Sequence, residues 1–324
     1  QRSKEPRALA NDAAVQLIFG PDALYGRPVI GTAARVRALT RDDVRAFHRA
    51  RFTPGTAALL LIGDIEDAEA AELAQRYFDD WRRAEPPEAA GQRSTETTLL
   101  TSTGWAEAFP GATAAAAAQQ ATTVFTVDRP DAVQSEIRVG HVGVARSHPD
   151  YFPLLILNTL LGGAFTSRLN LNLRERQGFT YGVRSGFAFR RAPGPFIIET
   201  AVGTDVTARA VAEIMRELEL IRADGATEGE VDNARRYLSG VLPLELQTTE
   251  QLAARLGDLV IYDLPDDYFQ TYAARIEAVS REDVDRVARE HLHLDKLSIV
   301  IAGNAGAVSD DLRALEIGPV VRHT

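Results

Sequence analysis

Residues 273–304 read AARIEAVSREDVDRVAREHLHLDKLSIVIAGN, and residues 33–64 read AARVRALTRDDVRAFHRARFTPGTAALLLIGD. The two stretches align without a gap at an offset of 240 residues. The identical pairs include Ala33/Ala273, Arg35/Arg275, Arg41/Arg281, Asp43/Asp283, Val44/Val284, Arg49/Arg289 and Gly63/Gly303. Two similar helix–strand connections can arise by chance, but an ungapped match of this length favours an internal duplication.

Both copies carry the same order of secondary-structure signals. Thr40 and Ser280 are expected to be helix N-caps, because each is followed three residues later by an aspartate that can complete a capping box. A helix, a short break and a buried strand should follow in each copy. In the first copy the strand is expected over the apolar run 57–62, and it should end at Gly63.

The chain before the second copy has the pattern of an α+β unit. The expected elements are a strand over 135–144, a helix over 148–161, a short helix over 167–176, an antiparallel hairpin of strands over 181–190 and 196–203, a helix over 206–221, a helix capped by Thr227 and Glu230, and helices over 250–262 and 266–279. Strands followed by a run of helices and a last strand predict an α+β fold, in which helices cover a mostly antiparallel sheet.

The length of 324 residues predicts two domains. We assign residues 1–84 to the C-terminal part of a first α+β unit, and residues 124–324 to a complete second unit. Residues 85–123, which are rich in Pro, Ser, Thr and Ala, are interpreted as an interdomain linker. The second unit begins near Ala121, so the repeat offset predicts that the first unit is incomplete and would begin about 120 residues before Gln1.

Composition narrows the class of protein. The chain carries 36 basic and 45 acidic side chains, a net charge of -9 and a pI near 5.3, which argues against a nucleic-acid partner. No segment reaches the roughly 20 apolar residues of a transmembrane helix. We therefore expect a soluble protein without a transmembrane segment, with cytoplasm and periplasm left open. The absence of cysteine excludes disulfides and thiolate ligands.

Motifs of common catalytic sites are absent from the sequence. There is no H-x-x-E-H, no H-E-x-x-H, no phosphate-binding loop and no nucleophile elbow. His291 and His293 could be pictured as a metal-binding pair, but they occupy a predicted helix end, where the helix dipole favours solvated histidines. The matching positions of the first copy are Arg51 and Thr53. We assign no metal ligand and no cofactor to this chain.

Two separated stretches carry a family resemblance. Residues 158–169 read NTLLGGAFTSRL, and residues 173–183 read LRERQGFTYGV. Further support comes from YGRPVIG at 25–31 and from Phe52-x-Pro54 before the run that ends at Gly63-Asp64. In this order the motifs resemble the C-terminal half of a subunit from the pitrilysin/insulinase family of zinc peptidases, which includes the mitochondrial processing peptidases.

The resemblance implies paired, structurally similar α+β units with a proteolytic chamber between two halves. It implies that zinc is held by H-x-x-E-H in a first unit, which this sequence lacks. It also implies that the second unit contributes an arginine and a tyrosine seven residues apart, and Arg174 and Tyr181 match that spacing. Their implied role is to bind the peptide backbone beside the scissile bond. From the residues alone, the simpler interpretation is favoured, in which Arg174 caps a helix end and Tyr181 packs at a strand start.

The function expected from this resemblance is that of the substrate-binding half of a zinc endopeptidase. Zinc would come from a homologous partner subunit, in a heterodimer or homodimer, or from a missing N-terminal segment, so the chain alone should not hydrolyse a peptide or unfolded protein. The alternative is a non-catalytic structural or assembly subunit of the same family. Arg184, Arg190 and Arg191 could line a peptide-binding face, although solvated sheet positions explain them equally.

Overall fold

The computed structural model describes residues 5–83 and 120–323, which group into two compact units. One unit comprises residues 5–29, 120–239 and 270–323, and the other comprises residues 30–83 and 240–269. The predicted first domain, 1–84, is therefore divided between the two units. The predicted linker lies outside the described residues up to residue 119.

The larger unit is built on a six-stranded mixed sheet with the strand order β3-β4-β2-β5-β1-β6. Its strands are β1 (Thr123–Asp128), β2 (Gln134–Val142), β3 (Val183–Phe187), β4 (Pro195–Gly203), β5 (Ser298–Gly303) and β6 (Val320–His323). Three pairings are antiparallel, whereas β1 runs parallel to β5 and β6. The predicted α+β class is confirmed, and the sheet is mixed. Three strands and several helices separate β1 from β5 in sequence, which is long enough for the two to pair in parallel.

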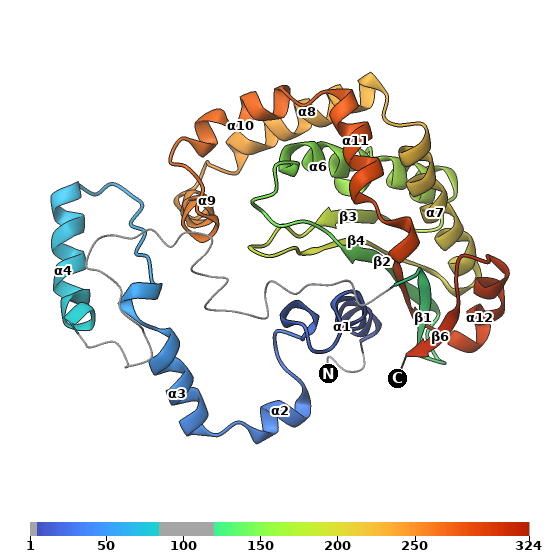
Figure 1. Cartoon of the computed structure of the whole chain (residues 1–324), viewed down its shortest axis with the longest axis horizontal. Coiled ribbons are helices and arrows are strands. Elements are labelled where there is room, and N and C mark those ends of the chain that lie inside the picture. The colour runs from blue at the N-terminus through green and yellow to red at the C-terminus, as the bar shows by residue number, and fades with distance from the viewer. Residues whose placement is uncertain (1–4, 84–119, 324) are drawn as a thin grey trace. The chain divides into compact units, whose positions relative to one another are not determined.

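Helices of the larger unit lie on both faces of this sheet (Figure 1). Side chains of α6, α7 and α11 form the main core with the inner faces of β2 and β4, while α1 packs on the opposite face against Phe125 and Val300. The helices of the chain are α1 (Pro6–Phe19), α2 (Ala33–Ala38), α3 (Arg41–Arg51), α4 (Asp67–Arg83), α6 (Tyr151–Asn158), α7 (Thr207–Ala223), α8 (Glu228–Leu244), α9 (Thr249–Tyr262), α10 (Tyr268–Glu277), α11 (Arg281–His291) and α12 (Ala305–Ala314). No helix in the described ranges combines the length and hydropathy of a membrane span.

Locally encoded features of the larger unit match their predictions. The hairpin is confirmed, since β3 and β4 pair antiparallel with Val183 opposite Thr200. The predicted helix over 206–221 is confirmed as α7, and Gly225 beyond its end has a φ of +78°, which favours glycine. The capping box at α8 is also confirmed, because Thr227 and Glu230 exchange hydrogen bonds.

Two predicted helices differ from α-helical geometry. The helix expected over 148–161 is α-helical only over α6, and it continues as the π-helical turn η4 (Thr159–Gly163). The short helix expected over 167–176 is largely the π-helical segment η5 (Asn170–Arg176). A widened turn at Gly162 brings its backbone against β3, where an added Cβ would lie 2.8 Å from the Ser185 nitrogen.

The first copy of the repeat forms its helices but not its strand. Both predicted capping boxes are present, at Thr40 before α3 and at Ser280 before α11. The strand prediction over 57–62 is wrong for the described structure, in which this segment belongs to no strand. The physical reason is the lack of a partner: β5 pairs with β1 and β2, whereas no strand of the described part pairs with 57–62.

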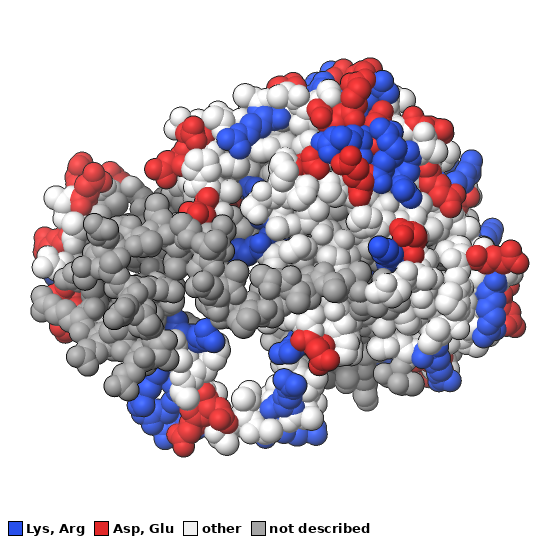
Figure 2. Space-filling model, viewed as in Figure 1, with Lys and Arg blue, Asp and Glu red and all other residues white. Residues whose placement is uncertain are grey.

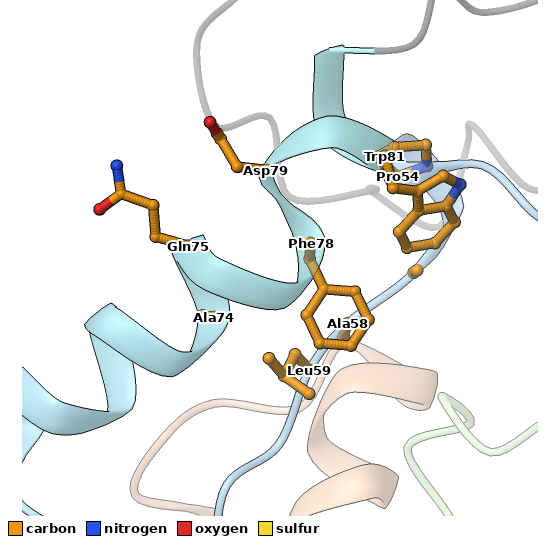
Figure 3. Close-up of a pocket in the computed structure, with 9 residues that line it drawn as sticks. Pro54, Ala58, Leu59, Ala74, Gln75, Phe78, Asp79 and Trp81 are labelled. Atoms are coloured by element: carbon orange, nitrogen blue, oxygen red, sulfur yellow. The ribbon is translucent and has the colours of Figure 1, made fainter.

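Apolar positions of the first copy are consequently exposed. Val44 is 58% exposed, whereas Val284 at the matching position is fully buried. The apolar hollow of about 600 Å³ beside residues 57–59 is closed on its other side by α4 through Phe78 and Trp81 (Figure 3). The internal duplication itself therefore remains a prediction from sequence.

One buried histidine gives the fold a pH dependence. His141 in β2 donates from Nδ1 to the Val142 carbonyl at 2.8 Å, and its Nε2 accepts from the His293 amide at 3.4 Å. Burial lowers the pKa of His141 to about 4, so the ring is neutral in the native state. Burial also lowers the pKa of His148 and of His293.

Acidification should therefore destabilise the protein below the ordinary histidine pKa of 6.5. Between pH 6.5 and about 4 the unfolded state binds a proton that the native state does not, so the His141 contribution falls by about 2 kcal/mol on going from pH ~7 to pH ~5. Urea unfolding at the two pH values measures this change. The free energy of unfolding of the variant His141→Gln should fall less between the two pH values than that of the native protein. An equal fall in both proteins would contradict the assignment of this pH dependence to His141.

Candidate functional site

Arg174 and Tyr181 lie on either side of the turn that joins η5 to β3. Arg174 is in the last turn of η5, and Tyr181 comes two residues before β3 begins. Between them the chain reverses at Gly178, whose φ of +65° lies in the region that favours glycine. Both residues are thus placed by one short connection at the edge of the sheet.

Tyr181 is an exposed side chain on a fixed backbone. Its side chain is 98% exposed. After it, the Asn170 side chain accepts from the Val183 amide at 3.1 Å and donates to the Val183 carbonyl at 2.8 Å. Before it, the Thr200 hydroxyl donates to the Thr180 hydroxyl at 2.9 Å, which in turn donates to the Gly182 carbonyl at 2.9 Å. The phenol is therefore held toward solvent with little freedom in its main chain.

Arg174 is more constrained than Tyr181. Its guanidinium lies 3.4 Å above the centre of the Phe165 ring, and its Nε donates to Glu175 at 2.9 Å. Its Nη2 donates to the same carboxylate oxygen. Nη1 has no hydrogen-bond partner within the described ranges, so one edge of the guanidinium remains available to an external acceptor.

A polar hollow lies beside Tyr181. It has a volume of about 460 Å³ and is bounded by α1, β2, β3 and β4. Arg7, Arg184 and Glu199 contribute to its walls together with Tyr181, whereas Arg174 is absent from its lining. The structure therefore places the two predicted residues at one turn, and only Tyr181 in this hollow.

The sequence profile described as the peptidase M16 inactive domain matches residues 38–238, more than half of the chain. The chain belongs to this family. Membership in a family described as an inactive domain is consistent with a chain that has no zinc site of its own.

Curated relatives of this M16 chain include proteins named as zinc proteases. An uncharacterized zinc protease of Mycobacterium leprae is 28% identical over 260 residues, which are 79% of this chain and 53% of the relative. An uncharacterized zinc protease of Mycobacterium bovis is 27% identical over 321 residues, which are 97% of this chain and 67% of the relative. The beta subunit of the mitochondrial-processing peptidase of Lentinula edodes is 21% identical over 297 residues, which are 88% of this chain and 59% of the relative. The chain spans about half to two thirds of the length of these relatives.

Solved structures show the same fold. The peptidase M16 inactive domain from Pseudomonas fluorescens matches with a TM-score of 0.77 at 24% identity, over 93% of this chain and 66% of that one. A chain of complex III2 from Candida albicans, with Inz-5 bound, matches with a TM-score of 0.74 at 12% identity, over 98% and 72%. Both likenesses support the α+β architecture of the M16 chain.

The family's link to zinc makes one cluster of this M16 chain relevant as a test. His148, Asp150 and His291 bring potential ligand atoms within 4.8 Å of one another. However, the Arg286 guanidinium binds both oxygens of Asp150, at 2.6 and 3.2 Å, and the His291 Nε2 lies 2.8 Å from the same carboxylate. The hydrogen bond from Arg286 lowers the pKa of Asp150 to about 2.

These residues form an ion-pair network and do not fit a zinc site. The carboxylate charge is already neutralised by Arg286, and the His148 Nδ1 accepts from the Asp150 amide at 3.1 Å. The network ties the start of α6 to α11, where acidic and basic side chains gather on the surface (Figure 2). His291 and His293, considered as a pair from the sequence, take part in different contacts. The His291 Nε2 binds Asp150, whereas the centre of the His293 ring lies 5.0 Å from the centre of the His141 ring.

Proposed function

We propose that this M16 chain orients peptide substrates for a zinc peptidase whose metal is bound by other residues. Those residues would belong to a homologous partner subunit, in a heterodimer or a homodimer, or to a segment of the polypeptide outside residues 1–324. The proposal is supported by family membership and by relatives that are named zinc proteases.

The observation that carries the proposal is the exposure of Tyr181 on a backbone fixed by Asn170 and Thr200. A large aromatic side chain with a polar tip gains nothing for the fold when it is 98% exposed. Its hydroxyl can donate a hydrogen bond to a peptide carbonyl, and its fixed main chain reduces the entropy lost on binding. These properties suit contact with an extended peptide.

Arg174 would act beside Tyr181 through its free Nη1. Stacking on Phe165 and the hydrogen bonds to Glu175 fix the plane of the guanidinium. The N–H bonds of Nη1 therefore point in set directions. Together the two side chains would hold the carbonyls of a bound peptide and so restrict the position of the scissile bond. The zinc ion, when present in the partner or the outside segment, would activate the attacking water.

The proposal is tested by a mixing experiment. Peptide hydrolysis is measured for the chain alone, for a zinc-bearing M16 homologue alone, and for the mixture. We expect hydrolysis above that of the homologue alone only in the mixture. The variant Arg174→Ala should lower this gain in hydrolysis severalfold. A gain that is unchanged in Arg174→Ala would remove this residue from the proposed role, and no gain in any mixture would contradict the proposal.

A second candidate function is that of a non-catalytic structural or assembly subunit. One observation favours it: most of the Arg174 guanidinium is satisfied by Phe165 and Glu175, as in a structural arginine. A Helicobacter pylori relative that is 27% identical over 154 residues is named a non-peptidase homolog. Stable pairing with the zinc-bearing homologue, without any gain in hydrolysis, would select this candidate.

A further inference from the structure

Two adjoining hollows lie along α1 on the sheet face opposite to the main helix layer. The helix contributes Arg7, Asn11, Ala14 and Val15, whose spacing places them on one face of α1. The hollow at Tyr181 and a second hollow of about 450 Å³ share Arg138, Arg184 and Glu199 in their walls. The two hollows therefore adjoin between α1 and the edge of the sheet, and we refer to them together as the trough.

The floor of the trough carries a row of three charged side chains. Arg184 in β3 lies opposite Glu199 in β4, and Glu199 lies opposite Arg138 in β2. Arg138 is almost fully buried, and its guanidinium donates to Asn11 at 2.7 Å and to Glu136 at 2.9 Å. Glu199 is turned toward Arg138, at 3.9 Å. Both acidic groups of the trough are thus engaged by the buried arginine.

Two guanidinium groups of the trough have no acidic partner among the described residues. Arg184 forms no ion pair with any carboxylate of the described residues, although Glu199 is its cross-strand neighbour. Arg7 in the first turn of α1 likewise has no ion pair or hydrogen bond there. Both line the same hollow as Tyr181. In a chain with a net charge of -9, this end of the trough offers unpaired positive charge and a phenol to a ligand.

The other end of the trough is apolar. Ala14 and Val15 of α1 line the second hollow together with Ile197 and Ala188 of the hairpin. The Phe187 ring, in contrast, packs into the main core against Phe196. Along β3 the distance from Arg184 to Ala188 corresponds to about four extended residues, at ~3.3 Å each. A ligand that uses both ends must therefore be elongated, with an anionic group at one end and an apolar group at the other.

We propose that this trough binds an extended peptide segment with an acidic side chain at Arg7 and Arg184 and an apolar side chain about four positions away, beside Ala188 and Ile197. The inference rests on the proposed function, because it names the class of peptide that Tyr181 would meet. The proposed preference for an acidic peptide is the opposite of what the net charge alone suggests, since an acidic protein attracts basic peptides at long range. Two charge-assisted hydrogen bonds, partly screened by water, should favour the acidic peptide about fivefold.

The test uses the full chain and three labelled peptides, of which the first two have both ends blocked and the third has only its N terminus blocked. The first has glutamate and leucine about four positions apart, the second has glutamine in place of glutamate, and the third is the glutamine peptide with a free C-terminal carboxylate. Fluorescence anisotropy gives their Kd values for the native chain and for Arg184→Gln and Arg7→Gln. Arg216→Gln is the matched control, because Arg216 is an exposed arginine of α7 in the opposite helix layer.

We expect the glutamate peptide to bind about fivefold more tightly than the glutamine peptide. The preference should disappear in Arg184→Gln and in Arg7→Gln, remain in Arg216→Gln, and return in Arg184→Lys. Equal binding of the two peptides, with affinity lost in Tyr181→Ala, would overturn the acidic preference and leave the proposed function intact. A preference for the free C terminus alone would also overturn the side-chain proposal. Binding of none of the peptides would contradict both proposals.

Discussion

Replacing Asn170 with alanine is expected to lower the free energy of unfolding by about 4 kcal/mol, because two buried backbone groups lose their partners. Asn170 is only 6% exposed, and its amide holds both the N–H and the C=O group of Val183. It also donates to the Ala164 carbonyl at 3.2 Å and to the Ser167 hydroxyl at 3.1 Å. One side chain thus joins the η4 turn, η5 and the edge strand β3.

Urea unfolding of the variant measures the loss. Asn233→Ala is the control, because Asn233 is an exposed asparagine whose one side-chain partner in the described part of the chain is Arg236. This variant should change stability by less than about 0.5 kcal/mol. Asn170→Asp should fall between them, since it keeps an acceptor for the Val183 amide but loses the donor to the Val183 carbonyl. Equal stability of Asn170→Ala and Asn233→Ala would contradict the role assigned to this amide.

Replacing Tyr181 with phenylalanine is expected to lower kcat/KM of the mixed peptidase by about tenfold, because a hydrogen bond to the substrate is lost. Tyr181→Ala should lower it further, since the ring contact is removed as well. Neither change should affect the unfolding free energy by more than about 0.5 kcal/mol, because the side chain is 98% exposed. Stability and activity are therefore separable at this residue.

The control for this prediction is Tyr237→Phe in α8. Tyr237 is 48% exposed, and its replacement by phenylalanine should leave kcat/KM unchanged. Steady-state kinetics of the chain mixed with the zinc-bearing homologue gives the values. If Tyr181→Phe and Tyr237→Phe behave alike, the hydroxyl of Tyr181 has no part in substrate binding.

Local signals predicted most of the larger unit. Thr40 and Ser280 cap their helices as expected, and the alternating residues of β3 and β4 form the expected hairpin. These features depend on hydrogen bonds and side-chain alternation within a few residues, so one sequence contains the information they need. The widened π-helical turn at Gly162 depends on close contact with Ser185, which the spacing of apolar residues does not reveal.

Non-local pairing explains the strand prediction that is wrong. Residues 57–62 and β5 have similar apolar runs, but only β5 has neighbouring strands to share hydrogen bonds. Apolar character specifies that a segment can be buried, whereas strand formation requires a partner. The helix over 6–19 received no assignment from sequence, because its apolar residues lack a clear helical stripe, although α1 covers one face of the sheet.

The candidate site was only partly predictable. The match to a family motif predicts Tyr181 and Arg174 as site residues. The structure adds that, of these two, Tyr181 lines the hollow and Arg174 does not. Asn170 was missed because it falls between the two motif stretches. A polar residue at a buried helical position is the signal that could have drawn attention to it. Arg7 could not be found from sequence, since it reaches the site only through packing of α1 on the sheet.

Contact between Tyr181 and a bound peptide is the central claim, and site-specific photo-cross-linking tests it most directly. Tyr181 is replaced by p-benzoylphenylalanine in the full chain, with the same replacement at Tyr237 as a control, and each protein is irradiated with the labelled glutamate peptide in the presence of the zinc-bearing homologue. The account predicts a cross-link to the peptide from position 181 and none from position 237. A peptide that binds the mixture but cross-links at neither position, or equally at both, would contradict it.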